Sequence, residues 1–289
     1  MVLAEDSRSP RRRWVGRTIL VVVLAGIVAA AYLGYRTVVQ TVSSPSCQAT
    51  ASGTSFTFTP EQAANAALIS AVAVKRGLPP RAATIALATA IQESKLRNLV
   101  YGDRDSVGLF QQRPSQGWGT SEQILDPVYS TNKFYDALTK VKDYETREIT
   151  QVAQAVQRSG YPEAYADHEQ EGRVLASTLT GHSPAGFGCQ LKPVNQASDG
   201  AAVGADLQAQ LGVTAKQDGV QLSLVGATAE EAWAAGQWAV ARADAYGIER
   251  VQVGDRVWER GQGGDAFSWS PAQASAPTAV TVRIGSPTG

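Results

Sequence analysis

Residues 82–94 have the sequence AATIALATAIQES, in which ten almost wholly apolar residues, 82–91, precede a glutamate. This pattern predicts a buried helix that ends beside the carboxylate of Glu93. An ionised carboxylate is costly to bury, so such a group either finds a partner or holds a proton near neutral pH. A protonated carboxyl group beside a cleft is what general acid catalysis of glycosidic bond cleavage requires.

Helical spacing places Glu93 on the inner face of this helix. The residues three, four and seven positions before it are small: Ala90, Thr89 and Ala86. The alternative interpretation is that Glu93 only caps the helix or pairs with Lys95 or Arg97.

The N-terminal segment has the pattern of a membrane anchor. Five arginines lie in residues 1–17, and residues 18–35 carry no charge. A stretch of this length is just sufficient to cross a hydrocarbon core of about 30 Å, and basic residues favour the cytoplasmic side. We therefore expect a single-pass cell-membrane protein with a cytoplasmic N-terminus and residues 37–289 outside the cytoplasm. A cleaved signal peptide, with the small residues 29–31 near its cleavage site, is the alternative.

Cys47 and Cys189 are the two cysteines of the chain, and they bracket one candidate domain. In an oxidising compartment such a pair predicts a disulfide, and two free buried thiols are the alternative. No metal site is expected, because the two histidines, His168 and His182, show no ligand spacing with the cysteines.

Composition and patterning divide the 289 residues into six segments. These are a basic tail, a transmembrane anchor, a linker, a mainly helical domain, a second linker and a small α/β domain: 1–17, 18–35, 36–58, 59–190, 191–216 and 217–289. Within the helical domain, apolar spacing and turn residues predict helices at about 60–77, 80–94, 128–142, 149–158 and 168–179. No long alternating strand pattern precedes residue 190.

The C-terminal segment predicts a β-α-β-β-β unit. Residues 220–225 alternate like a strand, and Thr228 with Glu231 forms a capping box that opens a helix to about Tyr246. A hairpin at 251–258 and a last strand at 279–284 follow. We expect the tryptophans of this unit to pack its helix onto the sheet: Trp233, Trp238, Trp258 and Trp269. The alternative is a docking face for carbohydrate or for an envelope protein.

Four short blocks, spread over residues 58–182, resemble the soluble lytic transglycosylases and goose-type lysozymes. They are Glu93-Ser94, SVGLFQ at 106–111, ILDP at 124–127 and AVQRSGY at 155–161. The family has a Glu-Ser pair, a Gly-Leu-Met-Gln block and an Ala-Tyr-Asn-Ala-Gly block, followed by a later tyrosine. This chain departs from it where Phe110 replaces Met, where Val156-Gln157 replaces Tyr-Asn, and where Ser159 replaces Gly.

The resemblance implies a lysozyme-like fold and cleavage of the bond between N-acetylmuramic acid and N-acetylglucosamine in peptidoglycan. Glu93 would protonate the glycosidic oxygen and then, as a carboxylate, take the proton of the 6-hydroxyl that closes an anhydro ring. Hydrolysis would need a second carboxylate, for which Asp103 and Asp105 are candidates, although both residues also suit a turn. A wall-binding or assembly protein with weak or no catalysis is the rival interpretation.

The resemblance also implies a set of substrate-binding residues: Ser94, Gly108, Phe110, Gln111, Gln157, and Tyr161 or Tyr165. No cofactor is expected. The implied partner is peptidoglycan, and the formal net charge of zero argues against nucleic acid.

Overall fold

The structure is a computed structural model that describes residues 21–34, 44–157, 162–195 and 199–285. The chain divides into two compact units, Met1–Ser44 and Pro45–Gly289. Each unit is described by itself.

The first unit contains a helix over residues 21–34. Among the described residues, no helix combines the length and the apolar character needed to span a membrane. The expected transmembrane helix over 18–35, and the single-pass membrane location that followed from it, are therefore wrong. The arginines of residues 1–17 lie outside the described residues.

The second unit begins with a small antiparallel sheet and a group of helices. The strands pair in the order β2-β1-β3: β1 (Ser46–Ala51), β2 (Thr54–Phe58) and β3 (Phe187–Gln190). The helices between β2 and β3 are α2 (Pro60–Lys75), α3 (Pro80–Ser94), α4 (Ser121–Leu125), α5 (Pro127–Leu138), α6 (Ile149–Gln157) and α7 (Glu169–Leu179). Short 3-10 helices cover Pro114–Gln116 and Pro162–His168.

Local sequence explains where these helices begin. Thr59 and Gln62 form a capping box at the start of α2, and Pro60 occupies the first turn, where its missing N–H costs nothing. Asp126 caps α5 by accepting hydrogen bonds from the backbone N–H groups of Val128 and Tyr129.

The second half of this unit is a six-stranded antiparallel sheet with helices packed on it. The strand order is β4-β5-β9-β6-β7-β8. The strands are β4 (Lys216–Asp218), β5 (Gln221–Val225), β6 (Ile248–Val253), β7 (Arg256–Glu259), β8 (Ser270–Pro271) and β9 (Ala279–Ile284). The helices are α8 (Gly200–Leu211), α9 (Ala229–Ala241) and α10 (Ala243–Tyr246), with a 3-10 helix at Gly264–Phe267. Alternate residues of β5 are buried, so one face of the sheet lies against the core.

The expected fold class is corrected in two respects. The chain is 50% helix and 19% strand, with the strands in two antiparallel sheets, and no membrane-spanning helix precedes them in the described residues. The first sheet lies in segments where we expected a linker and no strands. The buried positions of its central strand β1 are small residues, Cys47, Ala49 and Ala51, so this strand lacks the large apolar side chains that mark a strand in the sequence.

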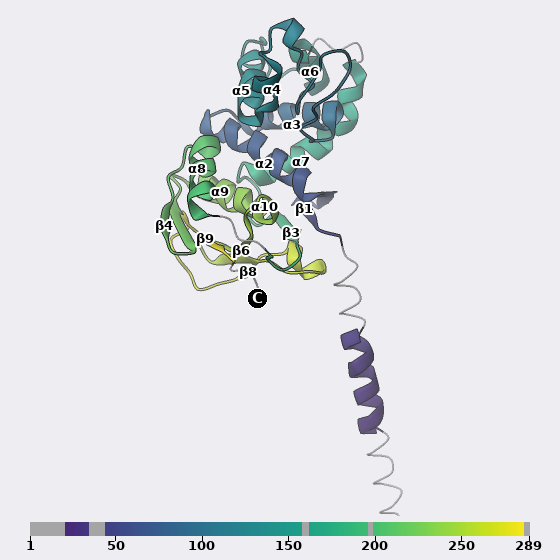
Figure 1. Cartoon of the computed structure of the whole chain (residues 1–289), viewed down its shortest axis with the longest axis vertical. Coiled ribbons are helices and arrows are strands. Elements are labelled where there is room, and N and C mark those ends of the chain that lie inside the picture. Colours follow the sequence, from purple (N-terminus) through teal and green to yellow (C-terminus); the bar gives the residue numbers. More distant parts are fainter. Residues whose placement is uncertain (1–20, 35–43, 158–161, 196–198, 286–289) are drawn as a thin grey trace, which may run out of the picture. The chain divides into compact units, whose positions relative to one another are not determined.

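A single hydrophobic core joins the helices to the six-stranded sheet. Helix α2 packs against α3 and α5 and also against α8 and α9, and buried residues of both halves form one cluster. Figure 1 shows α8 and α9 between α2 and the sheet. The Nε1–H of Trp269 donates to the backbone carbonyl of Phe187 at 2.8 Å, and Lys75 Nζ donates to that of Ala209 at 2.7 Å. Residues 200–211, within the expected second linker, are therefore part of the core as α8.

The tryptophans of the second half are largely internal. Trp238 is 1% exposed and its Nε1–H donates to Gln210 Oε1 at 2.8 Å, while Trp258 is fully buried. Trp233 is half-buried and its ring meets that of Trp269 edge to face, with centroids 5.1 Å apart. Helix α9 does pack on strands β6 and β9, while Trp238 hydrogen-bonds α8 and Trp233 meets a ring in the segment before β8.

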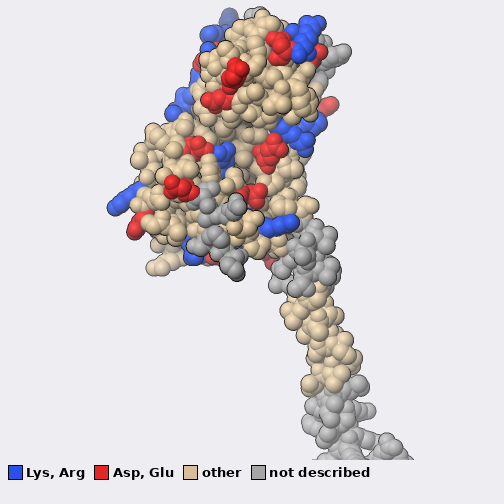
Figure 2. Space-filling model, in the orientation of Figure 1, with Lys and Arg blue, Asp and Glu red and all other residues tan. Residues whose placement is uncertain are grey.

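The predicted disulfide is confirmed. Cys47 and Cys189 are paired across neighbouring strands β1 and β3, with an S–S distance of 2.02 Å. On the face shown in Figure 2, acidic and basic side chains of this unit are interspersed, as expected for equal numbers of the two.

Candidate functional site

Glu93 lies in the last turn of α3, and the chain turns sharply directly after it. Lys95 and Leu96 both have positive φ, 55° and 58°. Two amide side chains of α2 hold this turn, since Gln62 Nε2 donates to the carbonyl of Lys95 at 3.0 Å and Asn65 Nδ2 to that of Leu96 at 2.8 Å. Sequence reasoning missed both amides, although they are polar residues on an otherwise apolar helix. They fix the position at which α3 ends, and with it the position of Glu93.

The Glu93 carboxyl group is half-buried and has a phenol as its neighbour. The hydroxyl of Tyr165, a residue 1% exposed, donates to Glu93 Oε1 at 2.6 Å. Burial raises the pKa of Glu93 above its ordinary value of 4.5, while hydrogen bonds from Tyr165 and Gln157 act in the opposite direction. The group therefore holds its proton more strongly than an exposed glutamate does. Tyr165 and Gln157 stabilise the carboxylate once the proton has left.

The turn at 108–112 lies against the end of α3. Ser94 Oγ donates to the backbone carbonyl of Leu109 at 2.7 Å, and Gln157 Nε2 donates to that of Phe110, also at 2.7 Å. Gly108 has a φ of +82°, and a Cβ there would lie 2.9 Å from the carbonyl oxygen of Ile124, so a side chain does not fit. The structure thus gathers three of the four resembling blocks, together with Tyr165, around Glu93.

Phe110 and Gln111 contribute differently from what was expected. The Phe110 ring is buried and stacks on Phe134 with centroids 4.5 Å apart, so only its backbone faces the site residue Gln157. Gln111 Nε2 lies 3.3 Å from the carbonyls of Tyr101 and Gly108, inside its own loop. Tyr161, the other predicted tyrosine, and Ser159 lie outside the described residues.

The two candidate second carboxylates are not placed with Glu93 by any contact of the described residues. Asp105 accepts from Arg113 Nε at 2.9 Å and from the backbone N–H and hydroxyl of Ser115 at 2.7 and 3.0 Å. These bonds hold the pKa of Asp105 well below its usual range. Asp103 has a side chain 87% exposed beside Arg104. Asp105 therefore organises the loop, as its alternative role predicted.

A second polar cluster, which sequence reasoning missed, adjoins Glu93 in the chain. Gln92 Oε1 lies 3.0 Å from His168 Nε2, and His168 Nδ1 lies 3.8 Å from Glu171 Oε2 at the start of α7. Burial raises the pKa of Glu171, with His168 and Lys95 acting against it. The sequence did carry a signal for this cluster, because His168 precedes Glu171 by three residues at the start of a predicted helix.

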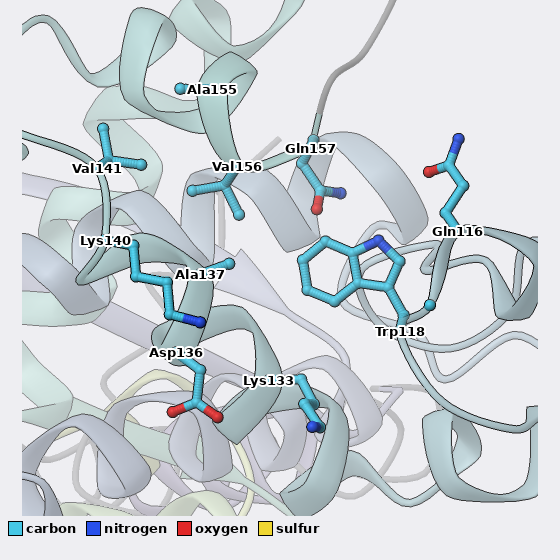
Figure 3. A pocket seen from close by; sticks show the side chains of 11 residues that line it. Gln116, Trp118, Lys133, Asp136, Ala137, Lys140, Val141, Ala155, Val156 and Gln157 are labelled. Carbon is cyan, nitrogen blue, oxygen red and sulfur yellow. The ribbon is translucent and has the colours of Figure 1, made fainter.

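A cavity of about 500 Å³ opens on the other side of Gln157 (Figure 3). Its lining comes from α5, α6 and the segment around Trp118: Gln116, Gly117, Trp118, Lys133, Asp136, Ala137, Lys140, Val141, Ala155, Val156 and Gln157. Val156, at the position of the family's tyrosine, is 5% exposed. Trp118 was noticed in the sequence only as the one tryptophan between residues 36 and 190.

The described residues contain no group of three or more His, Cys, Asp or Glu side chains arranged to hold a metal ion. A second cavity, of about 590 Å³, lies by Arg81, Arg173 and His182 and includes none of the predicted site residues. The half-buried Glu93 carboxyl group can take part in proton transfer.

No protein-family model matches this chain, and no curated protein matches it either. The chemistry attributed to the Glu93 site therefore rests on the geometry of its own residues.

Proposed function

We propose that this protein cleaves the glycosidic bond between N-acetylmuramic acid and N-acetylglucosamine in peptidoglycan, with Glu93 as the single acid and base. The observation that carries the proposal is the half-buried Glu93 carboxyl group, with a raised pKa and a buried Tyr165 hydroxyl 2.6 Å away. The resemblance of the surrounding blocks to lytic transglycosylases supplies the bond and the substrate.

Proton transfer in the first step uses the protonated form of Glu93. Its proton passes to the glycosidic oxygen as the bond from that oxygen to the anomeric carbon breaks. The negative charge that this leaves on Glu93 is stabilised by the hydroxyl of Tyr165 and the amide of Gln157. Burial favours the acid before the step, and the two donors favour the carboxylate after it.

The second step reverses the role of the same group. The Glu93 carboxylate accepts the proton of the muramic acid 6-hydroxyl, whose oxygen bonds to the anomeric carbon and closes a 1,6-anhydro ring. This returns Glu93 to the acid form with no water consumed. One carboxyl group suffices for both steps, which fits a site whose nearby Asp105 is engaged by Arg113 and Ser115.

The test is digestion of purified peptidoglycan by the full chain, with mass analysis of the released fragments. We expect anhydro-ended products from the wild type and none from Glu93→Gln, which keeps the side chain's size. Glu145→Gln, at an exposed glutamate, is the matched control and should retain activity.

Three results would contradict this mechanism or part of it. Reducing ends without anhydro rings would indicate hydrolysis by a second carboxylate. Anhydro products that persist in Glu93→Gln would remove Glu93 from the chemistry. Glycan that stays intact although it binds the wild type would identify a wall-binding protein instead.

A further inference from the structure

We propose that the cavity beside Gln157, lined by Trp118, Lys133 and Lys140, binds an acidic sugar through its carboxylate. The inference deepens the proposed function, on which it rests for the identity of the glycan. It assigns to this cavity the selection of muramic-acid-containing strands over neutral polymers of N-acetylglucosamine.

The aromatic wall of the cavity suits a sugar ring. Trp118 is half-buried, and its backbone carbonyl accepts a hydrogen bond from the Tyr129 hydroxyl at 3.3 Å, which holds this segment against α5. Figure 3 shows the indole between Gln157 and Lys133, with its six-membered ring toward Ala137 and Val156. An indole presents a large, rigid apolar face, which is the surface on which the apolar face of a pyranose packs.

The cationic wall comes from one side of α5 and the turn after it. Lys133 lies on α5 and Lys140 in the turn directly after it, and both line the cavity. Lys133 Nζ lies 5.4 Å from the centroid of the Tyr129 ring. Among the described residues, neither lysine has a carboxylate within ion-pair distance, so both charges are available to a ligand.

The one acid in the lining does not cancel these charges. Asp136 lies between the two lysines in sequence, and its Oδ1 is bonded to Arg76 Nη2 at 2.8 Å. Arg76 is held in turn by the backbone carbonyl of Asn132 at 2.9 Å. The cavity therefore keeps an excess of positive charge, which favours an anionic ligand over a neutral one.

Gln157 connects this cavity to the acid. Its side chain borders the cavity, its Nε2 donates to the Phe110 carbonyl at 2.7 Å, and it lowers the pKa of the Glu93 carboxyl group. A sugar in this cavity would therefore meet Gln157, the residue that the cavity shares with the Glu93 site. In peptidoglycan the carboxylate within reach is the lactyl group of N-acetylmuramic acid or, where that group carries a peptide, a carboxylate of the peptide.

The experiment measures binding by calorimetry in the full-length Glu93→Gln protein, which cannot turn the ligand over. The probes are the neutral tetramer of N-acetylglucosamine, an alternating muramic acid tetrasaccharide with free lactyl carboxylates, and the same tetrasaccharide carrying stem peptides. Lys133→Gln/Lys140→Gln is compared with Lys192→Gln/Lys216→Gln, which removes two exposed lysines that lie outside the cavity lining.

We expect the cavity double variant to bind at least one acidic tetrasaccharide about tenfold more weakly, with the neutral tetramer unchanged and the control double variant unaffected. If only the free lactyl probe binds more weakly, the bound group is the lactyl carboxylate. If only the peptide probe binds more weakly, the bound groups are the peptide carboxylates. Trp118→Ala should weaken all three probes. Unchanged binding of both acidic probes, or an equal loss for the neutral one, would overturn the inference.

Failure of the inference and failure of the proposed function give different results. If the wild type releases anhydro products but the lysine variant binds every probe normally, the cavity assignment is wrong and the function stands. If no product forms but the lysines still discriminate acidic from neutral glycan, the cavity assignment stands and the catalytic function is wrong.

Discussion

Glu93 is subject to opposing effects that together suit it to proton transfer. Burial raises its pKa, and the hydrogen bonds from Tyr165 and Gln157 lower it. The first effect has a thermodynamic consequence for the whole protein, because a group whose pKa differs between the folded and unfolded states makes stability depend on pH. The hydrogen bond from the Tyr165 hydroxyl lowers the pKa of Glu93, and this effect can be tested separately from the packing of the Tyr165 ring.

We predict that Glu93→Gln makes the protein more stable at neutral pH and not at pH 4. The folded-state pKa of Glu93 lies above 4.5, so its favourable contribution is fully present below 4.5 and is lost as the pH rises through the folded value. The melting temperature of the variant should therefore exceed that of the wild type at pH 7 to 8, with the difference vanishing at pH 4. A difference that does not change with pH would contradict the raised pKa.

We predict that Tyr165→Phe raises the pKa of Glu93 further, because it removes a donor to the carboxylate and leaves the ring in place. The alkaline limb of the pH–activity profile for glycan cleavage should move to higher pH, and the maximal rate should fall. Tyr135→Phe is the matched control. Tyr135 is equally buried, and its hydroxyl donates to the Ile69 carbonyl at 2.9 Å. Removing this hydroxyl should lower the free energy of unfolding by about 1 kcal/mol and leave the pH–activity profile unchanged.

At the level of elements, the close packing of α3 on α7 positions Glu93 and Tyr165 together. Tyr165 belongs to the 3-10 helix Pro162–His168, which leads directly into α7. A Cβ at Gly172 of α7 would lie 2.9 Å from the Thr84 carbonyl oxygen and 3.0 Å from the Ala88 backbone nitrogen, both in α3. The backbones of the two helices are therefore in contact at this point.

Gly172→Val should separate α3 from α7, at a cost of about 1–3 kcal/mol in the free energy of unfolding, and should also lower glycan cleavage by displacing Tyr165. Urea titration measures the first effect. The control is Gly204→Ala in α8, where the new Cβ would meet only Leu222 Cδ2 at 3.9 Å. That variant should gain about 0.5–1 kcal/mol, as expected for Ala in place of Gly inside a helix. Equal effects at the two positions would contradict the close approach.

Elements with long periodic patterns could be predicted from the sequence. The structure confirms the helix expected from Pro60 as α2, the strand at 220–225 as β5 and the last strand as β9. The first sheet could not be predicted, because the buried residues of its central strand β1 are alanine and cysteine, and because the partner strand β3 is 136 residues or more further along the chain (187 minus 51). Helix α8 was missed because its small residues resemble a linker.

The candidate site was predictable where a residue matches the pattern of the resembling family, and not where only the fold supplies the neighbour. Glu93 and Tyr165 were both selected from the sequence, and the structure brings them into contact. Gln62 and Asn65 hold the turn after α3 from a different helix. Lys133 and Lys140 reach the cavity only because α5 lies beside α6. The positions of these four residues in the sequence do not reveal which residues of other elements they meet in the fold.

At the scale of the whole molecule, one core and one disulfide join the chain from Pro45 onward. The Cys47–Cys189 bond spans 142 residues of sequence, so it removes much of the freedom of the unfolded chain. Replacing both cysteines with serine should lower the free energy of unfolding by about 2–5 kcal/mol. Denaturant unfolding with and without a reductant checks this, since the reductant should affect the wild type and leave the double serine variant unchanged.

The same bond determines how the molecule responds to mechanical tension. A pull between the two ends of the unit Pro45–Gly289 travels along β1, crosses the sulfur–sulfur bond and continues from β3. Helices α2 to α7 lie in the closed loop between the two cysteines, so the covalent path of the pull bypasses them. Extension would release only the residues outside the loop, and reduction would add about 500 Å, at roughly 3.5 Å per residue for the 142 residues. The segment that carries Glu93 would therefore stay a closed loop on a stretched chain, while release of α8 and α9 would uncover the face of α2 that packs on them.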